Sequence, residues 1–215
     1  MLGQTNSNTI SQESGALTVS YSEEFQTVDL ILDSTAETRG VDAFALSLIK
    51  AERQIRRVVT HLIFQFPCFG YRDIKDMRET LADNQGVYFE GLERGIDALY
   101  PRTVKELIGE DYDRLRDHMK NANGFRNKIF HGQLPSKYLS RGELLSCVND
   151  IRAWSQALAK STLAEFGYDG FRDSFRKSEV PALSERFKVK LSDIAGYSRF
   201  IQQNMQRPKG AKHAS

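Results

Sequence analysis

The segment GFRNKIFHGQ gathers residue types that can act together on a phosphate. Asn127 and His131 lie four residues apart, so a helix through the segment would place them on one face. Arg126 directly precedes Asn127 and is expected at the start of that helix, where its long side chain can sweep back over the same face. Gly124 and Gly132 would let the backbone turn sharply at both ends. The pattern predicts a polar cluster of Arg, Asn and His.

This cluster suits cleavage of RNA, which carries its own nucleophile, the 2′-OH, beside each scissile phosphate. Histidine titrates near neutral pH and can transfer the protons. The planar guanidinium of Arg126 can grip two phosphate oxygens, and Asn127 can orient His131 or donate to the phosphate. Such a site needs no metal ion and no cofactor. A purely structural alternative remains open, in which Asn127 caps a helix and His131 satisfies its C-terminal end.

Two long helices are expected to position the segment. Apolar residues recur with helical spacing over residues 41–66, and Glu52 interrupts that stripe on its inward face. Because a buried carboxylate needs a partner, Glu52 is expected either to pair with Arg56, four residues on, or to contact Arg126 or His131. A capping box at residues 140–143 opens a second long helix through residue 164. We expect the two helices to pack side by side, nearly antiparallel.

Weaker signals complete a mainly α-helical prediction. Helices are expected over residues 71–82 and 87–100, after a capping box at 103–106, and over 111–121, where Asn123 and Gly124 should interrupt the last one. Short strands are expected near the N-terminus, from the alternation of Leu17, Val19 and Tyr21 and the apolar run 28–32. The predicted organisation is a polar N-terminal extension over 1–38, a helical domain over 39–166, and a C-terminal extension with a basic tail over 167–215.

The motif RNKIFH resembles the Arg-Asn-x-x-x-His signature of HEPN domains, an all-helical superfamily rich in toxin and antiviral ribonucleases. The stretch AERQIRRVV is also similar to the first helix of several bacterial HEPN families. The resemblance covers roughly residues 41–166 and implies a HEPN-like helical bundle. It further implies a homodimer in which two motifs face each other. Arg126 and His131 would then be the catalytic pair, Asn127 an auxiliary residue, and Glu52 a supporting one.

One departure from the family pattern limits what can be carried over. HEPN toxins paired with nucleotidyltransferase antitoxins have a tyrosine two residues after the histidine, where this chain has Gln133. Control by adenylylation of that tyrosine is therefore not expected here. The sequence predicts a metal-independent endoribonuclease of the toxin or phage-defence type, with RNA as substrate and a cognate antitoxin or regulatory protein as a further partner. The alternative is a non-catalytic HEPN module that binds RNA, nucleotide or a partner protein.

Bulk composition is compatible with these expectations. The formal net charge is only +2, so an RNA site would have to be a local patch. The two cysteines form no metal-binding pattern, and the first twenty residues lack the features of a secretory signal. No apolar run is long enough to span a bilayer, so no membrane association is expected and the cytoplasm is the expected location.

Three other groups of residues carry weaker alternatives. The arginines at positions 53, 56 and 57 are expected to form a solvated face, or else to border an RNA groove. The aromatic and basic segment 167–178 is expected to be a docked terminal segment, or else a stacking surface for bases. His61 and His118 are expected to be surface or capping residues rather than ligands.

Overall fold

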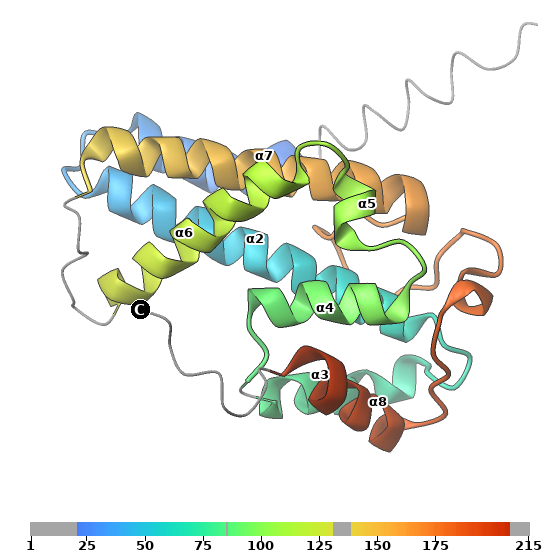
Figure 1. The fold of residues 1–215 in the computed structure, drawn as a ribbon. Helices are drawn as coiled ribbons and strands as arrows, with labels where there is room; N and C mark the ends of the chain where they lie inside the picture. Colours follow the sequence, from blue (N-terminus) through green and yellow to red (C-terminus); the bar gives the residue numbers. More distant parts are fainter. Residues whose placement is uncertain (1–20, 85, 131–138, 207–215) are drawn as a thin grey trace, which may run out of the picture.

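The computed structural model describes residues 21–84, 86–130 and 139–206, and every regular element within these ranges is helical (Figure 1). Residues 21–33 form the first helix. The helices that follow are α2 (Arg39–Phe64), α3 (Ile74–Asp83), α4 (Phe89–Leu99), α5 (Val104–Ile108), α6 (Tyr112–Phe130), α7 (Arg141–Phe166) and α8 (Ile194–Phe200). Two 3₁₀ turns, Tyr71–Asp73 and Leu183–Arg186, and a π-helical turn, Ile201–Met205, complete the list. None of these helices has the length and apolar character needed to cross a bilayer.

The predicted N-terminal strands are wrong for the residues that the structure describes. Residues 28–32 belong to the helix 21–33, and Leu17 and Val19 lie outside the described residues. Tyr21, Phe25 and Val28 fit helical spacing, and the last two are fully buried. The alternation that suggested a strand covers too few residues to exclude this helical face.

The two long helices pack along each other as expected, but they run parallel (Figure 1). Gly40 near the start of α2 lies beside Leu144 near the start of α7. Further along, the Gln54 side-chain amide donates to the Ser155 carbonyl at 2.9 Å. The predicted antiparallel orientation is therefore wrong. The chain returns to the starting end of α2 through α6, and this return allows α7 to run in the same direction as α2.

Parallel packing brings the carbonyl ends of α2 and α7 together, and the segment after α7 satisfies them. Lys177 Nζ donates to the carbonyl of Phe64 at the end of α2 and to those of Phe66 and Phe69 in the turn that follows. Ser178 Oγ donates to the Phe166 carbonyl at the end of α7, at 2.6 Å. A cation at this point also opposes the partial negative charge of the helix ends.

Helix α6 crosses α2 and packs against α7, and its position is fixed largely by buried residues on its inner face. Leu115 and Met119 are buried, as is Ala122. The helix continues through Gly124, so the predicted interruption is wrong. A Cβ at Gly124 would meet nothing within 4 Å, which shows that no close approach or special backbone geometry requires glycine there. The roughly 1 kcal/mol that an exposed glycine costs a helix does not outweigh the packing of α6.

A buried ion pair also fixes α6 against α4. Glu93 has a side chain that is 6% exposed and accepts from Arg116 Nε at 2.7 Å. Burial raises the pKa of Glu93 to about 7, against the opposing attraction of the Arg116 guanidinium. This pair joins the centre of α4 to the first half of α6, so it holds the helix that carries Arg126.

Trp154 of α7 is fully buried at the place where α4, α6 and α7 meet. Its ring centroid is 5.6 Å from that of Phe89 on α4 and 5.9 Å from that of Tyr112 at the start of α6. The indole N–H has no hydrogen-bond partner among the described residues. The aromatic cluster therefore joins α4, α6 and α7 through packing rather than through polar contacts.

The residues after α7 belong to the same core as the long helices. Tyr168, Tyr197, Ile201 and Met205 are all fully buried. Gly91 on α4 gives room for the π-helical turn, because a Cβ there would lie 2.0 Å from the Met205 carbonyl oxygen. The chain thus crosses the bundle again after α7 and ends its described part against α4.

Candidate active site

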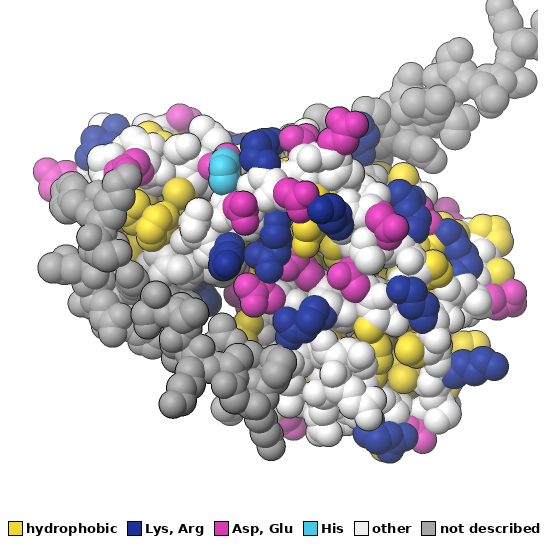
Figure 2. All heavy atoms as spheres, in the orientation of Figure 1, with side chains coloured by type: hydrophobic (Ala, Val, Ile, Leu, Met, Phe, Trp, Pro, Cys, Tyr) yellow, Lys and Arg dark blue, Asp and Glu magenta, His cyan; other side chains and the backbone are white. Residues whose placement is uncertain are grey.

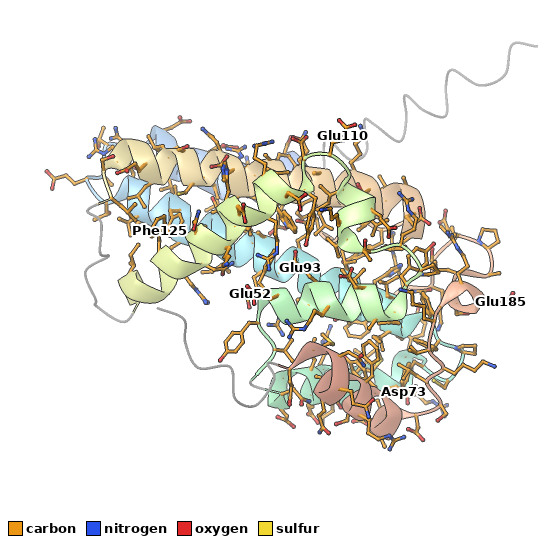
Figure 3. The ribbon with its side chains drawn as sticks, viewed as in Figure 1. Glu52, Asp73, Glu93, Glu110, Phe125 and Glu185 are labelled. Atoms are coloured by element: carbon orange, nitrogen blue, oxygen red, sulfur yellow. The ribbon has the colours of Figure 1, made fainter. Side chains whose placement is uncertain are left out.

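Arg126 lies near the C-terminal end of α6, where the helix passes over α2. Its guanidinium Nη2 is 3.8 Å from Glu52 Oε2, and both side chains are partly buried, at 33% and 26% exposure. Glu52 and Phe125, the neighbour of Arg126, are labelled in Figure 3. The inward-facing carboxylate on the first long helix and the arginine of the motif thus meet in space, although 74 positions separate them.

The other oxygen of the same carboxylate binds Arg56. Arg56 Nη2 donates to Glu52 Oε1 at 3.2 Å, which confirms the expected pairing at helical spacing. Glu52 therefore fulfils both alternatives derived from the sequence, the pair with Arg56 and the contact with Arg126. One carboxylate thus lies between two guanidinium groups, one from its own helix and one from α6.

The sequence suggested that the motif lies at the start of a helix. In the structure it lies at the end of one. Residues 126–130 form the last turn of α6, which begins fourteen residues before Arg126. His131 and the side chain of Asn127 lie outside the described residues. The structure thus locates Arg126 and Glu52, while the predicted roles of Asn127 and His131 stay predictions.

The expectation of a surface or capping role is wrong for His61. Its side chain is fully buried and its ring stacks on Tyr168, with the centroids 4.4 Å apart. Burial lowers the pKa of His61 to about 4, so the ring is neutral near pH 7. His118 lies on α6 and is 40% exposed, with its Nδ1 2.9 Å from an oxygen of Asp150 on α7. Both histidines have structural partners in the fold.

The aromatic and basic segment 167–178 is docked against the helical core, which confirms the favoured expectation. Tyr168, Phe171 and Phe175 are buried, so their rings do not present faces to a base. Arg176 donates to the Gly167 carbonyl at 3.2 Å and lies over the ring of Tyr168. These aromatic residues therefore anchor the segment.

Two contributors to the site region escaped the sequence-based expectations. The Glu93 to Arg116 pair, which holds α6, had a signal in the sequence, since Glu93 lies on the apolar face of α4 as Glu52 does on α2. Arg78 on α3 faces the arginines of α2 across a groove. No local pattern indicates this placement, because it depends on how α3 folds back.

Comparisons of the chain with protein-family models, with curated proteins and with solved structures find no match. The function is therefore argued from the motif and from the geometry around Arg126 and Glu52.

Proposed function

We propose that the protein is a metal-independent endoribonuclease of the HEPN type, with Arg126 and His131 as the catalytic pair. The observation that carries the proposal is the approach of Arg126 on α6 to Glu52 on α2, at 3.8 Å. One oxygen of the Glu52 carboxylate approaches Arg126 and the other binds Arg56, so Glu52 can orient the arginine of the motif. The resemblance of RNKIFH to the HEPN signature supports the same assignment.

In the proposed reaction the ribose 2′-OH attacks the adjacent phosphorus, and the bond from phosphorus to the 5′-oxygen of the next nucleotide breaks. His131 transfers protons, and Arg126 stabilises the extra negative charge on the phosphoryl oxygens. The products are a 2′,3′-cyclic phosphate, or the 3′-phosphate formed from it by water, and a 5′-hydroxyl. Asn127 orients His131 or donates to the phosphate.

The site is proposed to be composite, with the motifs of two copies of the chain facing each other. A basic site confined to the surroundings of Arg126 fits the rest of the surface. Figure 2 shows basic and acidic side chains interspersed over the face that it draws, in keeping with a net charge of +2. In a toxin or defence setting, a cognate antitoxin or regulatory protein would restrain the activity.

The test is to incubate the purified protein with RNA in the presence of a metal chelator and to identify the ends of the fragments. Cleavage should persist, and 2′-O-methylation of the scissile nucleotide should abolish it. His131→Ala should lower the rate by about two to four powers of ten. Arg126→Lys keeps the charge but loses the two-pronged contact, and should also be severely impaired.

Glu52→Gln and Arg72→Gln complete the set of variants. Glu52→Gln removes the charge that holds Arg126 and should lower kcat, while RNA binds at least as well because a carboxylate has left the site. Arg72 is exposed on the turn before α3, away from the site, so Arg72→Gln should cleave like the natural protein. Cleavage that depends on a divalent metal and leaves 5′-phosphates would overturn the assignment of roles. Binding of RNA without any cleavage would favour the alternative, a non-catalytic HEPN module.

A further inference from the structure

Beside the Arg126 and Glu52 site lies a groove of about 340 Å³ between α2, α3 and the segment that follows α7. Four arginines line it, of which three come from α2 and one from α3: Arg53, Arg56, Arg57 and Arg78. One carboxylate, Asp173, lines it too, and this group accepts the backbone N–H of Phe175 at 3.1 Å. The groove is thus strongly positive although the whole chain is nearly neutral.

The four arginines are held differently. Arg56 pairs with Glu52, and Arg57 donates to the backbone carbonyl of Phe171. Arg78 lies over the Phe175 ring, with its guanidinium carbon 4.8 Å from the ring centroid. In this stacked position the N–H groups in the plane of the guanidinium can still donate to another acceptor. Within the part of the chain that the structure describes, neither Arg53 nor Arg78 forms an ion pair.

The base of the groove is apolar. Met77 and Leu81 of α3 line it and are nearly fully buried, at 1% and 7% exposure. Guanidinium groups above an apolar base match a ligand that carries phosphates and also has apolar faces, as a nucleotide does. The volume is at the lower end for a bound small molecule, which corresponds to a short stretch of a strand rather than a duplex.

The groove adjoins the proposed cleavage site along α2, because Arg56 lines the groove and pairs with Glu52. Glu52 binds Arg126 on one side and Arg56, a groove residue, on the other. From Glu52 to Thr60, at the far end of the groove, α2 rises by about 12 Å. A strand whose scissile phosphate lies at Arg126 can therefore continue along α2 and place its flanking phosphates among these arginines.

From this arrangement we infer that the groove binds the phosphodiester backbone of single-stranded RNA on one flank of the cleavage site. The inference rests on the proposed ribonuclease function. Arg53 and Arg78 contact the flanking phosphates, and the apolar floor formed by Met77 and Leu81 receives the ribose or the nucleobase. The groove thus anchors substrates longer than the nucleotides at the scissile bond.

The test measures binding of a fluorescent, fully 2′-O-methylated 12-nucleotide RNA, which the protein cannot cleave. We compare the natural protein with the double variant Arg53→Gln/Arg78→Gln. The matched control is Arg72→Gln/Arg114→Gln, which removes the same charge from two exposed arginines that do not line the groove. The groove variant should bind at least tenfold more weakly, and the control within twofold. Loss of two phosphate contacts should also flatten the plot of log K against log salt concentration by about 1.4.

Cleavage assays separate this inference from the proposed function. On a long RNA the groove variant should show a raised KM and an unchanged kcat, and on a dinucleotide it should match the natural protein. If the natural protein cleaves RNA and the groove variant binds and cleaves equally well, the groove assignment is wrong and the ribonuclease stands. If RNA binds through the groove and no RNA is cleaved, the ribonuclease fails and the strand site stands. Equal weakening by the control pair, or displacement of the RNA by micromolar adenosine monophosphate, would overturn the strand site.

Discussion

At the scale of single residues, Glu52 shows how one carboxylate can organise a basic site. With 26% of its side chain exposed, it is neither a solvated surface charge nor a buried ion whose desolvation would dominate its energy. It meets Arg56 at 3.2 Å and Arg126 at 3.8 Å, which reduces the repulsion between two guanidinium groups. Its main effect is therefore expected on the geometry of the site rather than on stability.

His61 makes a testable contribution to the pH dependence of folding. Its folded pKa is lowered by burial to about 4, whereas the unfolded chain takes up the proton near pH 6.5. Between these values the unfolded state binds more protons, so stability falls as the pH falls. The difference corresponds to about 3 kcal/mol over this range.

We expect His61→Phe to lose this pH dependence, because phenylalanine keeps a ring against Tyr168 but does not titrate. The measurement is urea unfolding of both proteins at pH 7 and pH 4.5. Between pH 7 and pH 4.5 the free energy of unfolding should fall more for the natural protein than for the variant. Other titrating groups, such as Glu93, are present in both proteins and cancel in this difference. A fall of the same size in both proteins would contradict the neutral state of His61.

At the scale of elements, the shared end of α2 and α7 depends on a lysine outside both helices. Lys177 donates to the carbonyl of Phe64 at the end of α2 and to two carbonyls of the following turn, at 3.0 and 3.2 Å. Lys177→Met keeps the aliphatic length and removes the cation. Because the side chain is exposed while its hydrogen bonds are partly buried, we expect a loss of about 1 kcal/mol in the free energy of unfolding. Urea unfolding measures this loss, and Lys75→Met, at an exposed position on α3, should change stability by less than half as much.

Local signals in the sequence predicted the elements, and non-local contacts decided what the sequence left open. The capping boxes Ser140 with Glu143 and Thr103 with Glu106 are present as expected, because a cap involves residues only three apart. The direction of α7 relative to α2 was mispredicted, since it depends on the path of all the helices between them. The helix break predicted at Gly124 was wrong for a related reason. Packing of the buried face of α6 outweighs the low helix propensity of one glycine.

The candidate site shows the same division. The position of Glu52 on the inward face of its helix indicated a buried partner, and Arg126 was one of those named. Arg78 carried no such signal, because only the fold of α3 against α2 brings it to the groove.

At the scale of the whole molecule, a composite site requires two copies of the chain. Val41 and Ile49 are exposed apolar residues eight positions apart on α2, at 37% and 47%, and Ile49 lies one turn before Glu52. We expect a second copy to cover this stripe. Equilibrium sedimentation at micromolar concentration should show a dimer, and Ile49→Glu should yield a monomer with strongly reduced cleavage of RNA.

Leu30 provides the control for this experiment. It is 66% exposed on the helix 21–33, so Leu30→Glu should leave both the dimer and the activity in place if the α2 stripe forms the contact. Full activity of a strictly monomeric Ile49→Glu protein would exclude a composite site.

The central position of Trp154 gives the protein an internal optical reporter. It is the only tryptophan in the sequence, and it touches the rings that fix α4 and the start of α6. An indole that is shielded from water and has no hydrogen-bond partner in the described part of the chain should fluoresce at short wavelength. Any tilt of the helix that carries Arg126 would change its surroundings, so RNA binding could be followed by emission from the natural protein, without an attached dye.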